Sequence, residues 1–224
     1  MVTSPNEQLT PYLFEITTGI LLGDGNLQKP KSCRYHRLRF AQNQKRQDYV
    51  DWLFQQYKNE EYLLTASKKR LIAKNHPSEF SYITPTNKKI EKGYSFQTRI
   101  SSAFNTHAEI FYAENSTKKR LCLELDIFDD LLTPTALAFW FMDDGTWPNK
   151  NSRSFLLCTH GFTVAQVNYF AILLNKKFGL ITTVRLNKGQ PVISISAKCF
   201  QKFENLILPY IQLIPSMAKK FPIT

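Results

Sequence analysis

Leu137-Ala138-Phe139-Trp140-Phe141-Met142-Asp143-Asp144-Gly145 is the segment from which the architecture can be predicted, because Thr17-Thr18-Gly19-Ile20-Leu21-Leu22-Gly23-Asp24-Gly25 has the same form. Each is an apolar run that ends in Asp-Gly and follows a Leu-Thr-Pro tripeptide. Threonine at an N-cap with proline next is a typical helix start, and glycine often follows a helix end. We therefore predict two related helices with Asp24 and Asp144 in their last turns. Gly25 and Gly145 are expected in the left-handed conformation.

The placement of these aspartates points to a metal ion. A carboxylate near the negative end of a helix dipole is unfavourable by about 0.3 to 1 kcal/mol. A divalent cation between the two carboxylates would offset this cost if the helices lie side by side. Gly19 and Gly23 are four residues apart on one helix face, so a partner helix can approach closely there. A single Asp-Gly could be an ordinary turn, but two with matching caps favour a shared site.

The repeated motif, both Leu-Thr-Pro caps and the closing segment Ile214–Pro222 resemble the LAGLIDADG homing endonucleases, in the branch where one chain carries two motifs. The resemblance implies that Asp24 and Asp144, at the eighth motif position, are the catalytic metal ligands. It also implies a catalytic basic residue near each of them. Lys119 and Lys220 hold equivalent places in the two halves and are the candidates. The lysine just before each of them, Lys118 or Lys219, is the alternative.

The second motif departs from the first at two positions. Phe139 and Asp143 stand where the first motif has Gly19 and Gly23. Close packing of the helices must therefore be asymmetric, and we expect Ala138 to supply the small contact. Asp143 is expected to have at most a supporting or neighbouring role. Two glutamines, Gln42 and Gln97, could orient a water molecule, and the sequence does not choose between them.

The rest of the chain predicts an α+β fold made of a duplicated α-β-β-α-β-β-α unit. Alternating or helical apolar patterns predict strands at 34–40, 93–101 and 152–159, a hairpin at 181–197, and helices at 43–58, 103–114, 163–178 and 199–210. The segment 75–92 is predicted as a long loop. The expected domains are residues 1–125, with motif helix 10–24, and 126–224, with motif helix 133–144. Together they predict a pseudo-two-fold monomer with two curved antiparallel sheets.

The charge predicts a polyanionic partner. The chain of 224 residues has a formal net charge of +11, spread evenly over its two halves. The outward side chains of two such sheets would form a basic DNA-binding saddle, and β-ribbons can read base edges in the major groove. Solvated outer sheet faces are the alternative. The residues expected to contact DNA are Arg37, Arg39, Lys68, Lys69, Arg70, Gln97, Arg99, Arg185, Asn187 and Lys188.

Together with these features, the resemblance implies a monomeric, site-specific endonuclease that hydrolyses both strands of a long asymmetric DNA duplex. Mg²⁺ is the expected cofactor, with Ca²⁺ or Mn²⁺ able to replace it. The alternatives are an RNA maturase that assists intron splicing and a DNA-binding regulator without cleavage. No protein partner or membrane is expected. The start Met1-Val2-Thr3-Ser4-Pro5 does not look like a secretion signal, and the cysteines show no zinc-ligand spacing. We expect an intracellular, intron-encoded protein of an organelle, a mitochondrion or a chloroplast.

Overall fold

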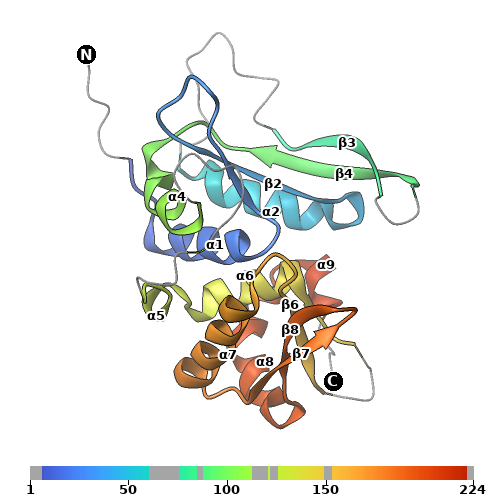
Figure 1. Cartoon of the computed structure of the whole chain (residues 1–224). Coiled ribbons are helices and arrows are strands. Elements are labelled where there is room, and N and C mark those ends of the chain that lie inside the picture. Colours follow the sequence, from blue (N-terminus) through green and yellow to red (C-terminus); the bar gives the residue numbers. More distant parts are fainter. Residues whose placement is uncertain are drawn as a thin grey trace.

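A computed structural model describes residues 7–60, 76–84, 88–112, 121, 126–148 and 153–220. Two helices, α1 (Pro11–Leu22) and α6 (Pro134–Asp144), pack against each other at the centre of the molecule (Figure 1). The elements up to α4 (Asn105–Phe111) lie on the α1 side and are called the N-terminal half. Those from α5 (Phe128–Leu131) onward lie on the α6 side and are called the C-terminal half.

The starts of both central helices are as predicted. The Thr10 hydroxyl accepts a hydrogen bond from the Leu13 N–H at 3.4 Å, and the Thr133 hydroxyl accepts one from the Ala136 N–H at 3.2 Å. Proline follows each threonine at the first helical position. These side chains satisfy N–H groups that have no partner inside the helix. The two Leu-Thr-Pro sequences therefore fix where the helices begin.

The prediction for the glycines at the helix ends was wrong. Gly145 has φ −75°, and Gly25 is not among the residues with positive φ, so neither is left-handed. Both are instead required by close approach. A Cβ on Gly145 would lie 2.1 Å from the Phe141 ring, and one on Gly25 would lie 2.8 Å from the Ile20 carbonyl oxygen. The chain folds back tightly over each helix end, and only glycine leaves room for this.

The N-terminal half contains a four-stranded antiparallel sheet in the order β1-β2-β4-β3. Its strands are β1 (Asn26–Gln28), β2 (Arg37–Asn43), β3 (Ser78–Ile83) and β4 (Ile90–Gln97). Leu38 and Phe40 of β2 are fully buried, as predicted, under helix α2 (Gln47–Lys58). The predicted loop at 75–92 was wrong, because residues 78–83 and 90–92 belong to the β3–β4 hairpin. The predicted strand 93–101 ends at Gln97, after which Ile100 is exposed and Ser101 is buried.

The C-terminal half repeats this arrangement with the order β5-β6-β8-β7. Its strands are β5 (Gly145–Thr146), β6 (Phe155–Cys158), β7 (Thr182–Asn187) and β8 (Gln190–Ile195). The predicted hairpin is confirmed, since Lys188 and Gly189 turn with φ of 51° and 79°. Helix α7 (Val164–Phe178) begins at a Thr163 capping box and ends at left-handed Gly179. The fold is α+β with two antiparallel sheets and repeated element order, as the sequence predicted.

Two further helices complete the C-terminal half. Helix α8 (Phe200–Ile211) packs on α6, and the short α9 (Pro215–Ala218) packs on α8 and on α2 of the N-terminal half. One hydrophobic core runs through both halves and across the α1–α6 contact. Across the described residues, none of the helices has the length and apolar character needed to cross a bilayer.

Candidate active site at the contact of the two motif helices

Small residues let α1 and α6 approach closely, and the contact is asymmetric. A Cβ on Gly19 would lie 2.5 Å from the Ala136 carbonyl oxygen and 2.7 Å from the Phe139 Cβ. A Cβ on Gly23 would lie 2.4 Å from the Cβ of Asp143. The backbone of Ala136, not the predicted Ala138, therefore faces Gly19. The missing side chain of Gly23 provides the space that Asp143 fills.

Asp143 connects the C-terminal ends of the two helices. Its Oδ2 accepts a hydrogen bond from the Asp24 backbone N–H at 3.0 Å. The Gln42 amide nitrogen on β2 donates to Asp24 Oδ2 at 2.6 Å and to Asp143 Oδ1 at 3.4 Å. The Arg46 guanidinium in turn donates to the side-chain oxygen of Gln42 (Oε1) at 2.9 Å. Carboxylates from both halves are thus held beside each other by one amide.

This cluster has a surplus of negative charge at its centre. Asp143 is buried, and burial raises the pKa of its carboxyl well above the usual value. Repulsion from Asp24 and Asp144 raises this pKa further, while the Asp24 N–H and Lys220 oppose the shift. Asp144 is the half-buried last residue of α6, as predicted. The prediction for Asp24 was wrong, because α1 ends at Leu22 and the exposed Asp24 lies in the turn that follows. The two predicted ligands therefore both lie near Asp143, and both are less buried than it is.

Lys220 lies against the end of α6. Its ammonium donates to the carbonyl oxygens of Met142, Asp143 (3.1 Å) and Gly145 (3.4 Å). Burial and the nearby Arg46 charge lower the Lys220 pKa to about 8, although the three aspartates oppose the shift. Of the two candidates in the C-terminal half, Lys220 makes these contacts, and Lys219 is exposed. Lys119, the equivalent prediction in the N-terminal half, lies outside the described residues.

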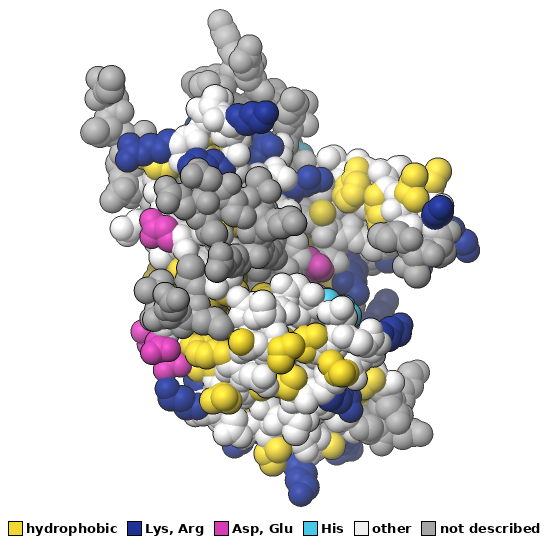
Figure 2. Space-filling model, viewed as in Figure 1, with side chains coloured by type: hydrophobic (Ala, Val, Ile, Leu, Met, Phe, Trp, Pro, Cys, Tyr) yellow, Lys and Arg dark blue, Asp and Glu magenta, His cyan; other side chains and the backbone are white. Residues whose placement is uncertain are grey.

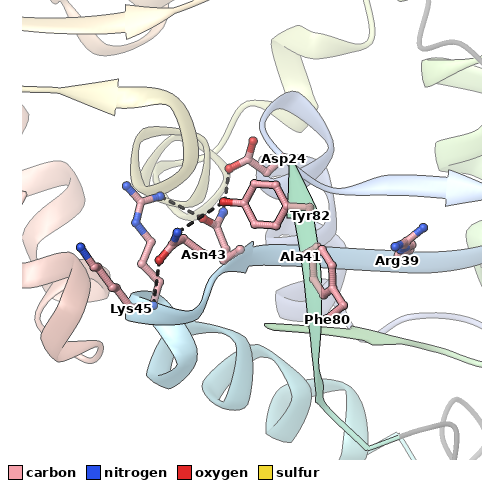
Figure 3. Close-up of a pocket in the computed structure, with 9 residues that line it drawn as sticks. Asp24, Arg39, Ala41, Asn43, Lys45, Phe80 and Tyr82 are labelled. Atoms are coloured by element: carbon pink, nitrogen blue, oxygen red, sulfur yellow. Dashed lines mark hydrogen bonds between the residues drawn. The ribbon is translucent and has the colours of Figure 1, made fainter. Parts of the chain in front are cut away.

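A pocket of about 700 Å³ opens next to Asp24 on the outer face of the first sheet (Figure 3). The residues that line it are Asp24, Arg39, Ala41, Gln42, Asn43, Lys45, Arg46, Phe80 and Tyr82. The Asn43 amide donates to the Tyr82 hydroxyl at 3.3 Å and to Glu91 at 2.9 Å, which ties β2 to the β3–β4 hairpin. The pocket therefore combines one carboxylate with several cationic and amide groups, a composition that suits a phosphate group beside a metal site.

Comparison with known proteins identifies the family. The model of the LAGLIDADG DNA endonuclease family matches residues 14–203. The probable intron-encoded endonuclease 1 of Wickerhamomyces canadensis is 31% identical over 210 residues, which cover 92% of this chain and 82% of that protein. The chain belongs to the LAGLIDADG DNA endonuclease family.

A solved structure agrees over the whole chain. The homing endonuclease I-WcaI, solved bound to its DNA recognition sequence, matches with a TM-score of 0.81 and 26% identity over 100% of this chain and 96% of that one. The cytochrome b mRNA maturase bI2 of Saccharomyces cerevisiae is 30% identical over 95% of this chain, but the match covers 48% of the maturase. Family and fold together identify the chain as a LAGLIDADG homing endonuclease.

Four of the ten predicted DNA-contacting residues lie on strands and face away from the core, namely Arg37, Arg39, Gln97 and Arg185. Arg39 pairs in register with Gln97, and both lie opposite the core face of the first sheet. Arg37 is on the same face and donates to the Gln28 side chain at 3.2 Å. Arg185 is exposed on β7. Figure 2 shows Lys and Arg side chains gathered beside the hollow between the two halves.

The remaining predicted DNA contacts fall in three places. Arg99 is exposed just beyond β4, whereas Asn187 and Lys188 are at the tip of the β7–β8 hairpin. Lys68, Lys69 and Arg70 lie outside the described residues. The first sheet therefore contributes more of the described polar face than the second.

Three features of the endonuclease site were not predicted from the sequence. Asp143 makes a direct contact with Asp24, and Arg46 supports Gln42. Gln42 lies beside Asp24, whereas Gln97 lines a separate pocket with Arg39 and Ser95. A usable signal was present, because Gln42 continues the inward alternation of Leu38 and Phe40. A glutamine at a core-facing position needs polar partners.

Proposed function

We propose that this endonuclease cuts both strands of a long, asymmetric DNA site through a divalent metal ion held at the ends of α1 and α6. The observation that supports this proposal is the position of Asp24 beside the Asp143-Asp144 pair. Asp24 lies two residues beyond the end of α1, Asp143 and Asp144 are the last residues of α6, and the Asp24 N–H donates to Asp143. Arginines lie on the outer faces of both sheets. Clustered anions would weaken binding to a polyanion unless a cation lies between them and the phosphate.

The donor set fits a hard divalent cation. Asp24 and Asp144 would hold it through carboxylate oxygens, because Asp143 is buried behind them and engaged by Asp24 and Gln42. Mg²⁺ is the ion we propose, since it needs few protein ligands and keeps waters and phosphate oxygens in its shell. When bound, such an ion activates a water molecule and neutralises charge on the phosphate. Two structures of I-DmoI, less than 25% identical to this chain, were solved with DNA and either Mn or Ca.

The protein groups around this site have separate roles. Gln42 orients the Asp24 carboxylate and the water near it, since its amide is fixed at its other end by Arg46. Lys220 supplies positive charge at the end of α6, where the phosphate of one strand would lie. Lys119 is proposed to do the same for the other strand. The two lysines would stabilise the negative charge that develops as the phosphodiester breaks.

Target recognition is proposed for the outer faces of both sheets. Arg37, Arg39, Gln97 and Arg99 would contact one side of the target, and Arg185, Asn187 and Lys188 the other. Lys68, Lys69 and Arg70 are proposed to extend the first side. Because the two faces differ in side chains, the target should be asymmetric. Residues 1–125 and 126–224 would each read about half of it, as a monomer.

An organelle intron is the proposed origin, because relatives are named intron-encoded endonucleases and cytochrome b mRNA maturases. The maturase names also support a second candidate, assistance in splicing of the host intron RNA. The two functions are separable. A maturase would accelerate splicing of its intron in vitro even after substitution of the metal ligands.

The test is cleavage of a randomised duplex library with Mg²⁺, followed by sequencing of the cut ends. We expect one asymmetric consensus site. Asp24→Asn and Asp144→Asn should each abolish double-strand cleavage and leave DNA affinity equal or higher, because each removes negative charge near the phosphate. Asp130→Asn, which neutralises an exposed carboxylate of α5, is the matched control and should cut normally. Undiminished cutting by either aspartate variant would reject the proposed ligands.

A further inference from the structure

One contact joins the C-terminal tail to the N-terminal half. Asp48, in the first turn of α2, accepts a hydrogen bond from the Ser216 backbone N–H through its Oδ2 at 2.7 Å. Ser216 is the second residue of α9, so this N–H has no acceptor within its own short helix. An acidic side chain from one half therefore caps a helix of the other half.

The capped segment leads directly to Lys220. Met217 is fully buried, and the Ala218 N–H donates to the Ile214 carbonyl at 3.0 Å. The Lys220 N–H then donates to the Met217 carbonyl at 2.9 Å. Residues 214–220 therefore form a compact turn whose start is held by Asp48 and whose end carries the Lys220 amine. A shift at Ser216 would be passed to Lys220 because little in the turn can absorb it.

We propose that Asp48 is a positioning residue for Lys220. Lys220 reaches the carbonyl oxygens at the end of α6 from a segment that the N-terminal half holds in place. The site served by Lys220 is then complete only when both halves are docked. The role in cleavage rests on the proposed function, and the role in placing the amine does not.

The proposal predicts an effect on one DNA strand. Lys220 serves one of the two sites, so a displaced Lys220 slows cleavage of that strand alone. A misplacement of about 1 Å in a reacting group can slow a reaction about 100-fold. We expect Asp48→Ala to slow the strand that depends on Lys220 by about 10- to 100-fold. Nicked duplex should accumulate.

The cleavage experiment follows each strand with its own end label. Asp48→Ala is compared with Lys220→Met and with the double variant. Asp48→Asn retains a side-chain oxygen that can accept from Ser216 and should cut at close to the wild-type rate. Asp51→Ala removes another acidic residue of α2 and is the matched control. If Asp48 acts through Lys220, the double variant is no slower on that strand than Lys220→Met alone. Equal slowing of both strands, or additive losses, would overturn the proposal.

A second measurement keeps the test independent of cleavage. Acetic anhydride labelling followed by mass spectrometry reports how well each lysine amine is protected, with exposed Lys219 as the internal reference. We expect faster Lys220 labelling in Asp48→Ala and wild-type labelling in Asp48→Asn and Asp51→Ala. Unchanged labelling in Asp48→Ala would refute the positioning role whether or not the protein cuts DNA. If the wild-type protein cuts no duplex but the variants show the expected labelling, only the proposed function is rejected.

Discussion

At the scale of single residues, the site depends on how one amide is held. Gln42 sits on the last inward position of β2, where it is 7% exposed. Its amide nitrogen faces Asp24 and Asp143, and its carbonyl oxygen accepts from Arg46. A side chain with both ends engaged has one orientation. Gln42 can therefore hold the exposed Asp24 carboxylate in a fixed position.

Gln42→Ala should slow cleavage by about 100-fold, because a misplacement of about 1 Å in a reacting group can cost that much. DNA affinity should be nearly unchanged, because Gln42 is buried beneath the face that meets DNA. Single-turnover cleavage at saturating protein measures this. Gln97→Ala is the control, and it should change affinity or base preference with little effect on the rate. If Gln97→Ala cut slowly and Gln42→Ala cut at the wild-type rate, the orienting role would belong to Gln97 and not to Gln42.

His107 gives the protein a pH-dependent stability. It lies fully buried on α4, with Nε2 at 3.1 Å from the Thr18 hydroxyl and its ring centroid 4.1 Å from that of Phe14. Burial lowers its pKa to about 3. The unfolded chain takes up this proton near pH 6.5, while the folded chain does so only near 3. Stability due to this group is therefore complete above pH 6.5 and decreases as the pH falls toward 3.

The free energy of unfolding should fall by about 2 kcal/mol between pH 7 and pH 5 because of His107. Urea denaturation at the two pH values measures the change. In His107→Gln the decrease should be smaller by about that amount. His160→Asn, which replaces an exposed histidine, is the matched control. Equal pH dependence in wild type and His107→Gln would show that the ring takes up its proton equally readily in the folded and the unfolded chain.

At the scale of elements, the α1–α6 contact sets how the halves dock. Gly23→Ala would place a methyl group 2.4 Å from the Asp143 Cβ, so the helices must separate or the carboxylate must move. Overpacking of this kind costs about 1 to 3 kcal/mol. We expect a lower denaturation midpoint, measured by circular dichroism, together with reduced cleavage. Gly161→Ala has no atom within 4 Å of its new methyl group and should leave both unchanged. If Gly23→Ala had the wild-type denaturation midpoint and cleavage rate, the α1–α6 contact would have to accommodate the added methyl group without cost.

Elements with strong local signals could be predicted from the sequence. The Leu-Thr-Pro caps determined the start of both motif helices, and the capping box with Gly179 determined the ends of α7. The β3–β4 hairpin was missed for a physical reason. All six β3 residues are exposed or half-buried, so the strand lacks the alternation that burial of one face produces. Local patterns also could not place Asp143 against Gly23, because that contact depends on how two distant helices dock.

Over the molecule as a whole, charge should govern DNA affinity. Removing one phosphate contact makes the slope of log K against log salt shallower by about 0.9. Arg39→Ala and Arg185→Ala, one on each sheet, should each reduce the slope by about that amount in fluorescence anisotropy titrations. Lys176→Ala is the control, since the ammonium of this α7 residue pairs with Asp129 at 2.6 Å. An unchanged slope in both arginine variants would place the DNA elsewhere on the protein.

The unequal pairing of Gly23 with Asp143 has a consequence for how the two halves can be combined. A homodimer built from two C-terminal halves would bring two buried carboxylates face to face at its symmetry axis. One built from two N-terminal halves would have no carboxylate to accept from the Asp24 N–H. Joining both halves in one chain keeps the glycine and the aspartate at equal numbers and excludes both mismatched pairings.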